Sequence, residues 1–239
     1  MKERAQSFGR VADDYDRARP SYPREVIAWL LAKAPGHEVV DVGAGTGKMT
    51  RALLDCGYDV VAIEPDAGMR ALNAGALAGS GEHLPLPDAS ADAIVYAQSW
   101  HWVEPAAALA EARRVLRPSG VLAAAWNYED PASEWIAEVG VAAGAERSTI
   151  PVPPSGEMPI PAFAGVDDDE TSTHRWRRRL TVDDLVLLVQ TFSWVSTRPA
   201  DEQAHVVDRV RAIATPRAVD GLLDVPMVTV CRRAVLNPA

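Results

Sequence analysis

The stretch "VVDVGAGTGKMT" (residues 39–50) places three glycines within five residues, directly after an apolar run. Glycine is favoured where a backbone turns sharply or where a ligand passes close to the main chain. The run before the glycines is rich in valine and lacks polar alternation, which is typical of a strand buried on both faces. The stretch therefore predicts a strand, then a tight loop with a ligand beside it, then a helix.

Strand-like and helix-like runs alternate from about residue 39 to residue 126. We expect strands at "EVVDV", "DVVAI", "ADAIVYA" and "GVLAAAW", and helices at "TGKMTRALLDCGY", "PDAGMRALNAGALA" and "EPAAALAEARRVL". Further along, "TVDDLVLLVQTFSWV" predicts a helix opened by a capping box from Thr181 and Asp184, and "MVTVCRRA" predicts a final strand. Strands that alternate with helices build a parallel sheet covered on both faces.

The composition of the 239-residue chain, with 48% apolar residues and a net charge of −9, is that of a soluble globular protein. The negative charge argues against nucleic acid as a partner. The chain contains no run of about 18 apolar residues, so no membrane span is expected. No secretory signal is recognisable. Cys56 and Cys231 fit no metal or redox spacing, so we expect a cytoplasmic protein. The basic run "HRWRRR" (residues 174–179) is expected to be the solvated face of a strand or helix.

Two common glycine-loop ligands fit poorly. A phosphate-binding loop of the nucleotide hydrolases needs a glycine five places before Gly47 and Ser or Thr after Lys48, but Val42 and Met49 occupy those positions. The dinucleotide fingerprint has glycines at its first, third and sixth places, whereas the third glycine here stands at the fifth. An NAD-type oxidoreductase stays open as an alternative.

Two acidic residues near the loop favour a different ligand. A carboxylate at Asp41, just before the loop, would repel a phosphate but suits a cationic group such as an ammonium. Glu64 ends the next strand, 21 residues after Gly43, where a carboxylate can accept hydrogen bonds from ribose hydroxyls. Together they describe adenosine joined to an amino acid, which is the constitution of S-adenosylmethionine. A non-catalytic adenosine-ligand-binding protein is a second alternative.

Four segments in order carry a family resemblance: "VVDVGAGTGKMT", "VVAIEPDAGM", "GSGEHLPLPDASADAIVYAQSWHWV" and "RVLRPSGVL". With them, the chain resembles the class I S-adenosylmethionine-dependent methyltransferases of small-molecule type, such as those of ubiquinone/menaquinone biosynthesis and of trans-aconitate. The resemblance covers roughly residues 8–126 and the terminal strand. It implies an α/β, Rossmann-like, doubly wound seven-stranded sheet, mostly parallel, with an antiparallel last strand inserted between the fifth and sixth.

The same resemblance implies one methyltransferase domain with four parts. These are an N-terminal helical cover (1–35), a cofactor-binding core (36–127), a variable, inserted substrate-binding region (128–200), and a C-terminal helix with the last strand (201–239). No motif identifies the substrate within the variable region, whose residues 151–161 are rich in proline.

The resemblance also assigns the cofactor contacts. The glycine loop would lie under the methionine moiety, Glu64 would hold the ribose, and Met69 would pack against adenine. Many relatives carry Asp where Ser80 stands, which leaves the contact to the adenine amino group open. The expected cofactor-binding residues are Asp41, Gly43, Ala44, Gly45, Gly47, Glu64, Pro65, Met69, Glu82, His83 and Gln98.

The segment "AQSWHWVEP" (residues 97–105) follows a predicted strand at its carboxyl end, where open parallel sheets place ligands. Gln98 would lie near the transferred methyl group, and His101 would line the site, orient the substrate or act as a base. The expected catalytic residues are therefore Gln98 and His101, and the expected substrate contacts are Tyr15, Arg19, Tyr22, His101 and Trp102. We expect methyl transfer from S-adenosylmethionine to an oxygen of a small molecule, with S-adenosylhomocysteine as product. No metal or membrane is expected, and monomer and homodimer both stay open.

Overall fold

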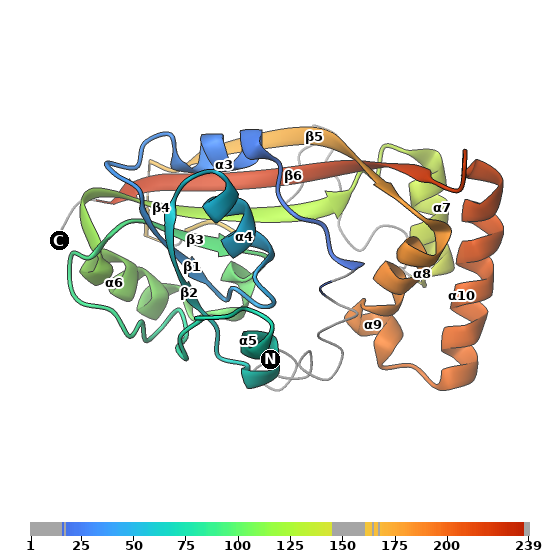
Figure 1. The fold of residues 1–239 in the computed structure, drawn as a ribbon, viewed down its shortest axis with the longest axis horizontal. Coiled ribbons are helices and arrows are strands. Elements are labelled where there is room, and N and C mark those ends of the chain that lie inside the picture. Colours follow the sequence, from blue (N-terminus) through green and yellow to red (C-terminus); the bar gives the residue numbers. More distant parts are fainter. Residues whose placement is uncertain (1–15, 17, 145–160, 164, 167, 237–239) are drawn as a thin grey trace.

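A computed structural model describes residues 16, 18–144, 161–163, 165, 166 and 168–236. Its centre is a six-stranded sheet of order β2-β1-β3-β4-β6-β5 (Figure 1). Strands β1 to β4 are parallel, and β6 runs antiparallel to both β4 and β5. The strands are β1 (Glu38–Val42), β2 (Asp59–Ile63), β3 (Ala91–Ala97), β4 (Leu116–Glu129), β5 (Glu170–Leu180) and β6 (Leu223–Leu236).

This topology confirms the predicted α/β fold, with the last strand inserted between two earlier strands and antiparallel to them. The predicted count of seven strands was wrong for the described part of the chain, which forms six. Beyond β2, the place of a further edge strand holds only an isolated parallel bridge between Ile63 and Leu77. The sequence around this bridge, "NAGALAGSG", consists mainly of alanine and glycine, which pair poorly as strands.

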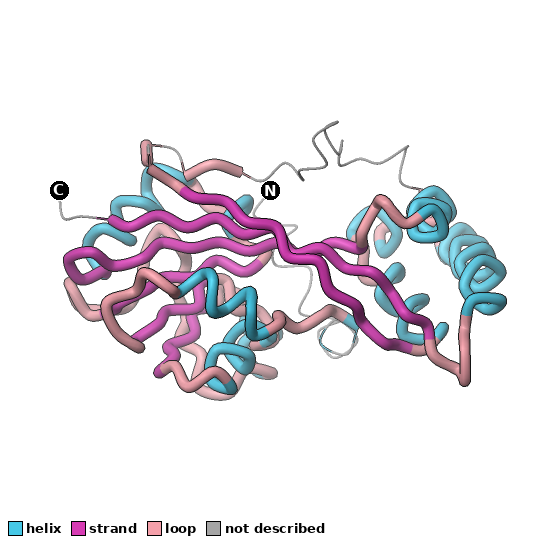
Figure 2. Tube along the Cα trace, turned by 90° about the horizontal axis from the view of Figure 1, so that it is seen from above, coloured by secondary structure: helices cyan, strands magenta, loops and turns pink. Residues whose placement is uncertain are grey.

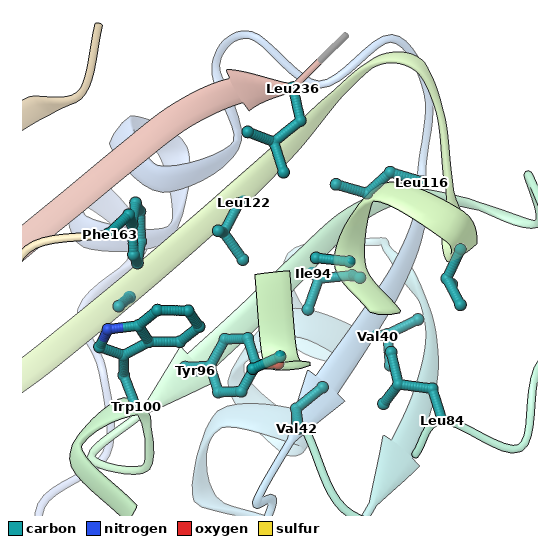
Figure 3. Close-up of a cluster of buried hydrophobic side chains, with 14 of the residues drawn as sticks. Val40, Val42, Leu84, Ile94, Tyr96, Trp100, Leu116, Leu122, Phe163 and Leu236 are labelled. Atoms are coloured by element: carbon teal, nitrogen blue, oxygen red, sulfur yellow. The ribbon is translucent and has the colours of Figure 1, made fainter. Parts of the chain in front are cut away.

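Helices cover both faces of the sheet, as the buried strand pattern requires. Ile94 and Tyr96 of β3 face the helix α6, whereas Ala93 and Val95 face α3 and α4. Figure 3 shows the α6 side, where Trp100 and Phe163 close the apolar cluster. The helices are α3 (Arg24–Leu31), α4 (Lys48–Asp55), α5 (Ala67–Ala71), α6 (Pro105–Val115), α7 (Glu134–Ala142), α8 (Val182–Gln190), α9 (Ser193–Ser196) and α10 (Ala200–Ala214), with single 3-10 turns η2 (Trp100–Trp102) and η3 (Thr215–Arg217).

Strands β5 and β6 extend past the rest of the sheet and carry a helical arm, which we define as α7, α8, α9 and α10 with the adjoining strand ends. Figures 1 and 2 show this arm at the opposite end of the molecule from α6. Its apolar cluster is separate from those of the sheet and includes Leu223 and Val225 of β6 with Leu185 and Val210. None of the helices in the described ranges is long and apolar enough to cross a membrane.

Candidate active site

The glycine loop lies at the carboxyl edge of the sheet, between the ends of three strands. The N–H groups of Gly43 and Ala44 donate to the carbonyl of Ile63 at 2.9 and 3.0 Å, which joins the end of β1 to that of β2. Gly43 has a φ of 68°, and a Cβ there would lie 2.5 Å from the Cβ of Ser99. Gly45 has a φ of 56°, but a Cβ there would meet nothing within 4 Å. Space is therefore open beside Gly45, where a ligand can approach the main chain.

Asp41 is fully buried below this loop. Its Oδ2 accepts a 2.7 Å hydrogen bond from Thr50 Oγ1, which in turn accepts one from Asn73 Nδ2 at 3.1 Å. Within the described residues, Oδ1 of Asp41 is buried without a hydrogen-bond partner. Burial raises the pKa of Asp41 to about 7; the Thr50 hydrogen bond opposes this and the negative charge of Glu64 adds to it. A buried oxygen without a donor fits a cationic ligand group.

Glu64 connects the glycine loop to the loop that follows β2. Its Oε2 accepts the N–H of Gly45 and its Oε1 accepts that of Asp66, both at 2.8 Å. The carboxyl group is buried, and this burial raises its pKa even though both backbone hydrogen bonds lower it. Met69 is buried on α5, where its N–H donates to the N-cap residue Asp66 at 2.9 Å. Pro65, which lies between Glu64 and Met69 in the sequence, is exposed.

The predicted adenine contacts Glu82 and His83 lie on the side of α6. Glu82 Oε1 accepts the N–H of Glu104 at 2.9 Å, next to the start of that helix. His83 is exposed. These two residues are therefore less directly joined to the glycine loop than Asp41 and Glu64 are.

Gln98 follows β3 with a backbone φ of 58°. A non-glycine residue in this left-handed region carries strain of about 1–3 kcal/mol, which is commonly stored at functional sites. The backbone N–H donates to Ala125 O at 2.9 Å, and side-chain Nε2 donates to Asn127 O at 2.8 Å. The next residue, Ser99, donates from Oγ to Val42 O at 2.6 Å. Gln98 is thus fixed between the ends of β1 and β4.

His101 lies on the 3-10 turn η2 that begins two residues after Gln98. Its Nδ1 accepts a 3.3 Å hydrogen bond from Trp126 Nε1. An indole N–H can only donate, so the neutral imidazole carries its proton on Nε2. The His101 side chain is exposed overall, yet partial burial of the ring still lowers its pKa. His101 is therefore neutral near pH 7 and presents an N–H donor.

The tryptophans on either side of His101 differ. Trp100 is buried, with its ring 4.9 Å from those of Tyr96 and Phe163, so it belongs to the core. Trp102 is 37% exposed, and its ring centroid lies 4.8 Å from that of His101. Trp102 is therefore the accessible one of the two.

Of the three predicted substrate contacts before α3, the structure describes two. Tyr15 lies outside the described residues. Arg19 places its guanidinium carbon 5.3 Å from the centre of the Phe192 ring, at the junction of α8 and α9. Tyr22 is buried in the apolar cluster of α3 and α4, which leaves little of its side chain accessible.

Sequence reasoning missed the residues that hold Asp41 and Gln98 in place. Thr50 stands nine residues after Asp41, in the first turn of α4, so its contact with Asp41 spans the glycine loop and follows no helical spacing. Nothing in the sequence marks Asn73 or Asn127. As for metals, the ranges covered by the structure contain no group of His, Cys, Asp or Glu able to hold one.

Comparison with known proteins assigns the family. Residues 40–124 match the family described as a methyltransferase domain. An uncharacterized methyltransferase of Mycobacterium tuberculosis (strain H37Rv) is 43% identical over 96% of both chains. The chain belongs to the S-adenosylmethionine-dependent methyltransferases. Membership of this family disfavours the NAD-type oxidoreductase alternative.

Two further comparisons place this methyltransferase among partial and structural relatives. The malonyl-[acyl-carrier protein] O-methyltransferase of Serratia marcescens is 36% identical over 49% of this chain and 50% of its own. A solved structure from Anaeromyxobacter dehalogenans, described as a type II methyltransferase, covers 92% of this chain and 99% of its own, with a TM-score of 0.65 and 23% identity. The latter likeness establishes the shared fold.

Proposed function

We propose that this methyltransferase transfers a methyl group to an oxygen of a small molecule, and that this oxygen belongs to an ionised carboxylate. The observation that carries the proposal is the hydrogen bond from Trp126 Nε1 to His101 Nδ1. It leaves His101 able to donate from Nε2 but without a free lone pair to remove a proton. A carboxylate needs no base, whereas a phenol or a carbon acid would benefit from one. The partial relative from Serratia marcescens is an O-methyltransferase by name.

The cofactor-binding role of the glycine loop and its acids belongs to the same proposal. The buried Oδ1 of Asp41, which has no hydrogen-bond partner among the described residues, fits the ammonium of S-adenosylmethionine. The space beside Gly45 fits a ligand lying on the main chain. Each oxygen of Glu64 accepts one backbone N–H and keeps a lone pair for a ribose hydroxyl. When bound, S-adenosylmethionine supplies a methyl group on a sulfonium and leaves as S-adenosylhomocysteine. The full proposed set is Asp41, Gly43, Ala44, Gly45, Gly47, Glu64, Pro65, Met69, Glu82, His83 and Gln98.

For the acceptor, we assign alignment rather than proton transfer to the residues after β3. Gln98 is fixed through its backbone and its side chain, and His101 donates a hydrogen bond to the acceptor oxygen. Trp102 and Arg19 add an apolar wall and a positive charge. Holding two reactants in line and excluding water can remove about 7–11 kcal/mol from a barrier.

The test is methyl transfer from S-adenosylmethionine to a panel of small carboxylic acids and phenols, with S-adenosylhomocysteine and the methylated product both measured. We expect methyl esters to form, and His101→Ala to lower turnover equally at all pH values between about 6 and 9. The matched control is His205→Ala, which removes an exposed histidine from α10. If the wild-type rate rises with pH through a pKa that is absent in His101→Ala, then His101 acts as a base, and its role as a hydrogen-bond donor is overturned. Binding of S-adenosylmethionine without any methylated product would leave the non-catalytic alternative.

A further inference from the structure

The basic run on β5 has an inward face. Along this strand, exposed side chains alternate with half-buried ones, and Trp176 and Arg178 belong to the half-buried set, whereas Arg177 and Arg179 are exposed. The run was expected to be a solvated face, and this is wrong for its inward half. Successive side chains of a strand point to opposite faces, so Trp176 and Arg178 are directed toward the protein.

Trp176 shows where this inward face leads. Its Nε1 donates to Thr229 Oγ1 at 2.8 Å, and Thr229 Oγ1 donates to Asn127 Oδ1 at 2.5 Å. The backbone carbonyl of Asn127 accepts a hydrogen bond from Nε2 of Gln98. A chain of hydrogen bonds therefore connects β5 to the residue proposed to align the acceptor. Arg178 lies two residues after Trp176 on the same face of β5, about 7 Å from it along the strand.

Arg178 carries a charge that the described residues compensate only in part. Its Nη1 is buried and has no hydrogen-bond partner among them. Burial lowers its pKa and the positive charge of Arg19 acts in the same direction, while Glu129 and Asp184 oppose them. A guanidinium stays protonated in proteins. Its buried N–H groups therefore destabilise the folded protein unless an acceptor binds to them.

Other cations approach the same place from different segments. Arg19 comes from the chain before α3 and lies against Phe192. Lys48 comes from the first turn of α4; it is 3.9 Å from Asp16, and the charge of Arg178 reaches it as well. The carboxylates of Asp16, Glu129 and Asp184 offset part of this positive charge, but the buried Nη1 of Arg178 still has no partner among the described residues. Like charges brought together in a partly desolvated site favour a bound anion.

We propose that Arg178, together with Arg19, binds an oxyanion carried by the methyl acceptor, a carboxylate or a phosphate separate from the atom that is methylated. The inference rests on the proposed function, because the acceptor is what brings the anion to this edge of the sheet. It assigns the substrate to small molecules with at least one such group at a distance from the methylated carboxylate. Planar guanidinium groups suit both oxyanions through paired N–H donors.

The experiment is calorimetric titration of the full chain, saturated with S-adenosylhomocysteine, at constant ionic strength. Succinate, inorganic phosphate and the neutral succinamide are the three probes, and the first two distinguish a carboxylate from a phosphate site. We expect succinate or phosphate to bind and succinamide not to bind. Arg178→Gln and Arg19→Gln should each weaken anion binding about tenfold or more and leave S-adenosylhomocysteine binding unchanged.

Arg179→Gln is the matched control, because it removes an exposed guanidinium from the next position of the same strand. Equal loss in Arg179→Gln and Arg178→Gln, or wild-type binding of succinamide as tight as that of both anions, would overturn the inference. Failure of the wild type to bind S-adenosylhomocysteine would instead contradict the proposed function, and anion titration of the unliganded chain would still report on Arg178.

Discussion

The proposed role of Asp41 predicts that ligand binding depends on pH. Its pKa of about 7 in the ligand-free protein means that the buried carboxyl group is largely protonated below neutral pH. A cationic ligand group favours the ionised form, so binding releases a proton. We predict that the affinity for S-adenosylhomocysteine increases with pH, by at most about tenfold per pH unit, and levels off above about pH 7.

Calorimetry at several pH values, in buffers of different ionisation enthalpy, measures both the affinity and the released proton. Asp41→Asn is the control, since it removes the titrating group and keeps an oxygen that can accept from Thr50. The assignment of Asp41 to the ammonium would be contradicted by an unchanged pH slope in Asp41→Asn.

The backbone of Gln98 is strained at its position. Its φ of 58° suits glycine better than any residue with a Cβ. Gln98→Gly and Gln98→Ala both remove the side-chain hydrogen bond to Asn127 O, but only glycine relieves the strain. We predict that Gln98→Gly is more stable than Gln98→Ala by about 1 kcal/mol in urea unfolding, while both variants lose turnover. A glycine variant with wild-type turnover would show that the amide does not align the acceptor.

Among the elements, helix α8 offers a test of the arm. Thr181 accepts the N–H of Asp184 at 3.1 Å, and the Asp184 carboxylate accepts the N–H of Thr181 at 3.1 Å, as the sequence predicted. We predict that Thr181→Ala lowers the free energy of unfolding by about 1 kcal/mol and that Thr181→Ser, which keeps the hydroxyl, restores most of it. Urea unfolding measures both. Equal losses in the two variants would show that the methyl group, and not the cap, is responsible.

The local signals that predicted the elements were those whose cause lies within a few residues. The capping box of α8 and the tight turn at Gly43, Gly45 and Gly47 depend on near neighbours, and both are present. Asp41 and Glu64 were singled out because one residue type at one spacing has a chemical reason. The structure brings both beside the glycine loop, and their binding roles stay predictions. Contacts between distant segments left no such signal: Asn73 reaches Thr50 over 23 residues, and Thr229 reaches Asn127 over 102.

Length and direction of the strands were also hard to predict. The apolar run "GVLAAAW" indicated a strand over residues 120–126, but pairing with β6 continues β4 to Glu129, and pairing with β3 lets it begin at Leu116. The inward face of β5 depends on which side meets the body of the protein, and an arginine-rich run does not indicate that by composition. The partner strand β6 lies far along the chain, so the register of Arg178 with Val225 could be read only from the fold.

At the scale of the whole molecule, separate apolar clusters predict separate cooperative units. The arm cluster involves Leu185 and Val210, whereas the site rests on the sheet clusters with Val40 and Met49. A ligand suppresses only those openings that dismantle its site. We predict that saturating S-adenosylhomocysteine slows amide hydrogen exchange in β1, β2 and the first turn of α4 much more than in α10.

Exchange followed by mass spectrometry on the free and liganded chain measures this difference. Amides of α3, which pack on the same sheet, serve as an internal reference for openings of the body. Equal slowing in α10 and β1 would show that arm and sheet unfold as one unit.

The position of β6 sets the order of assembly during synthesis. Residues 223–236 are translated after the five other strands that the structure describes, yet they fill the gap between β4 and β5. Before they leave the ribosome, β4 presents an unpaired edge and β5 has no neighbour, and such edges invite pairing with other chains. The nascent polypeptide therefore stays dependent on protection from aggregation until residues 223–236 have emerged and paired with both strands.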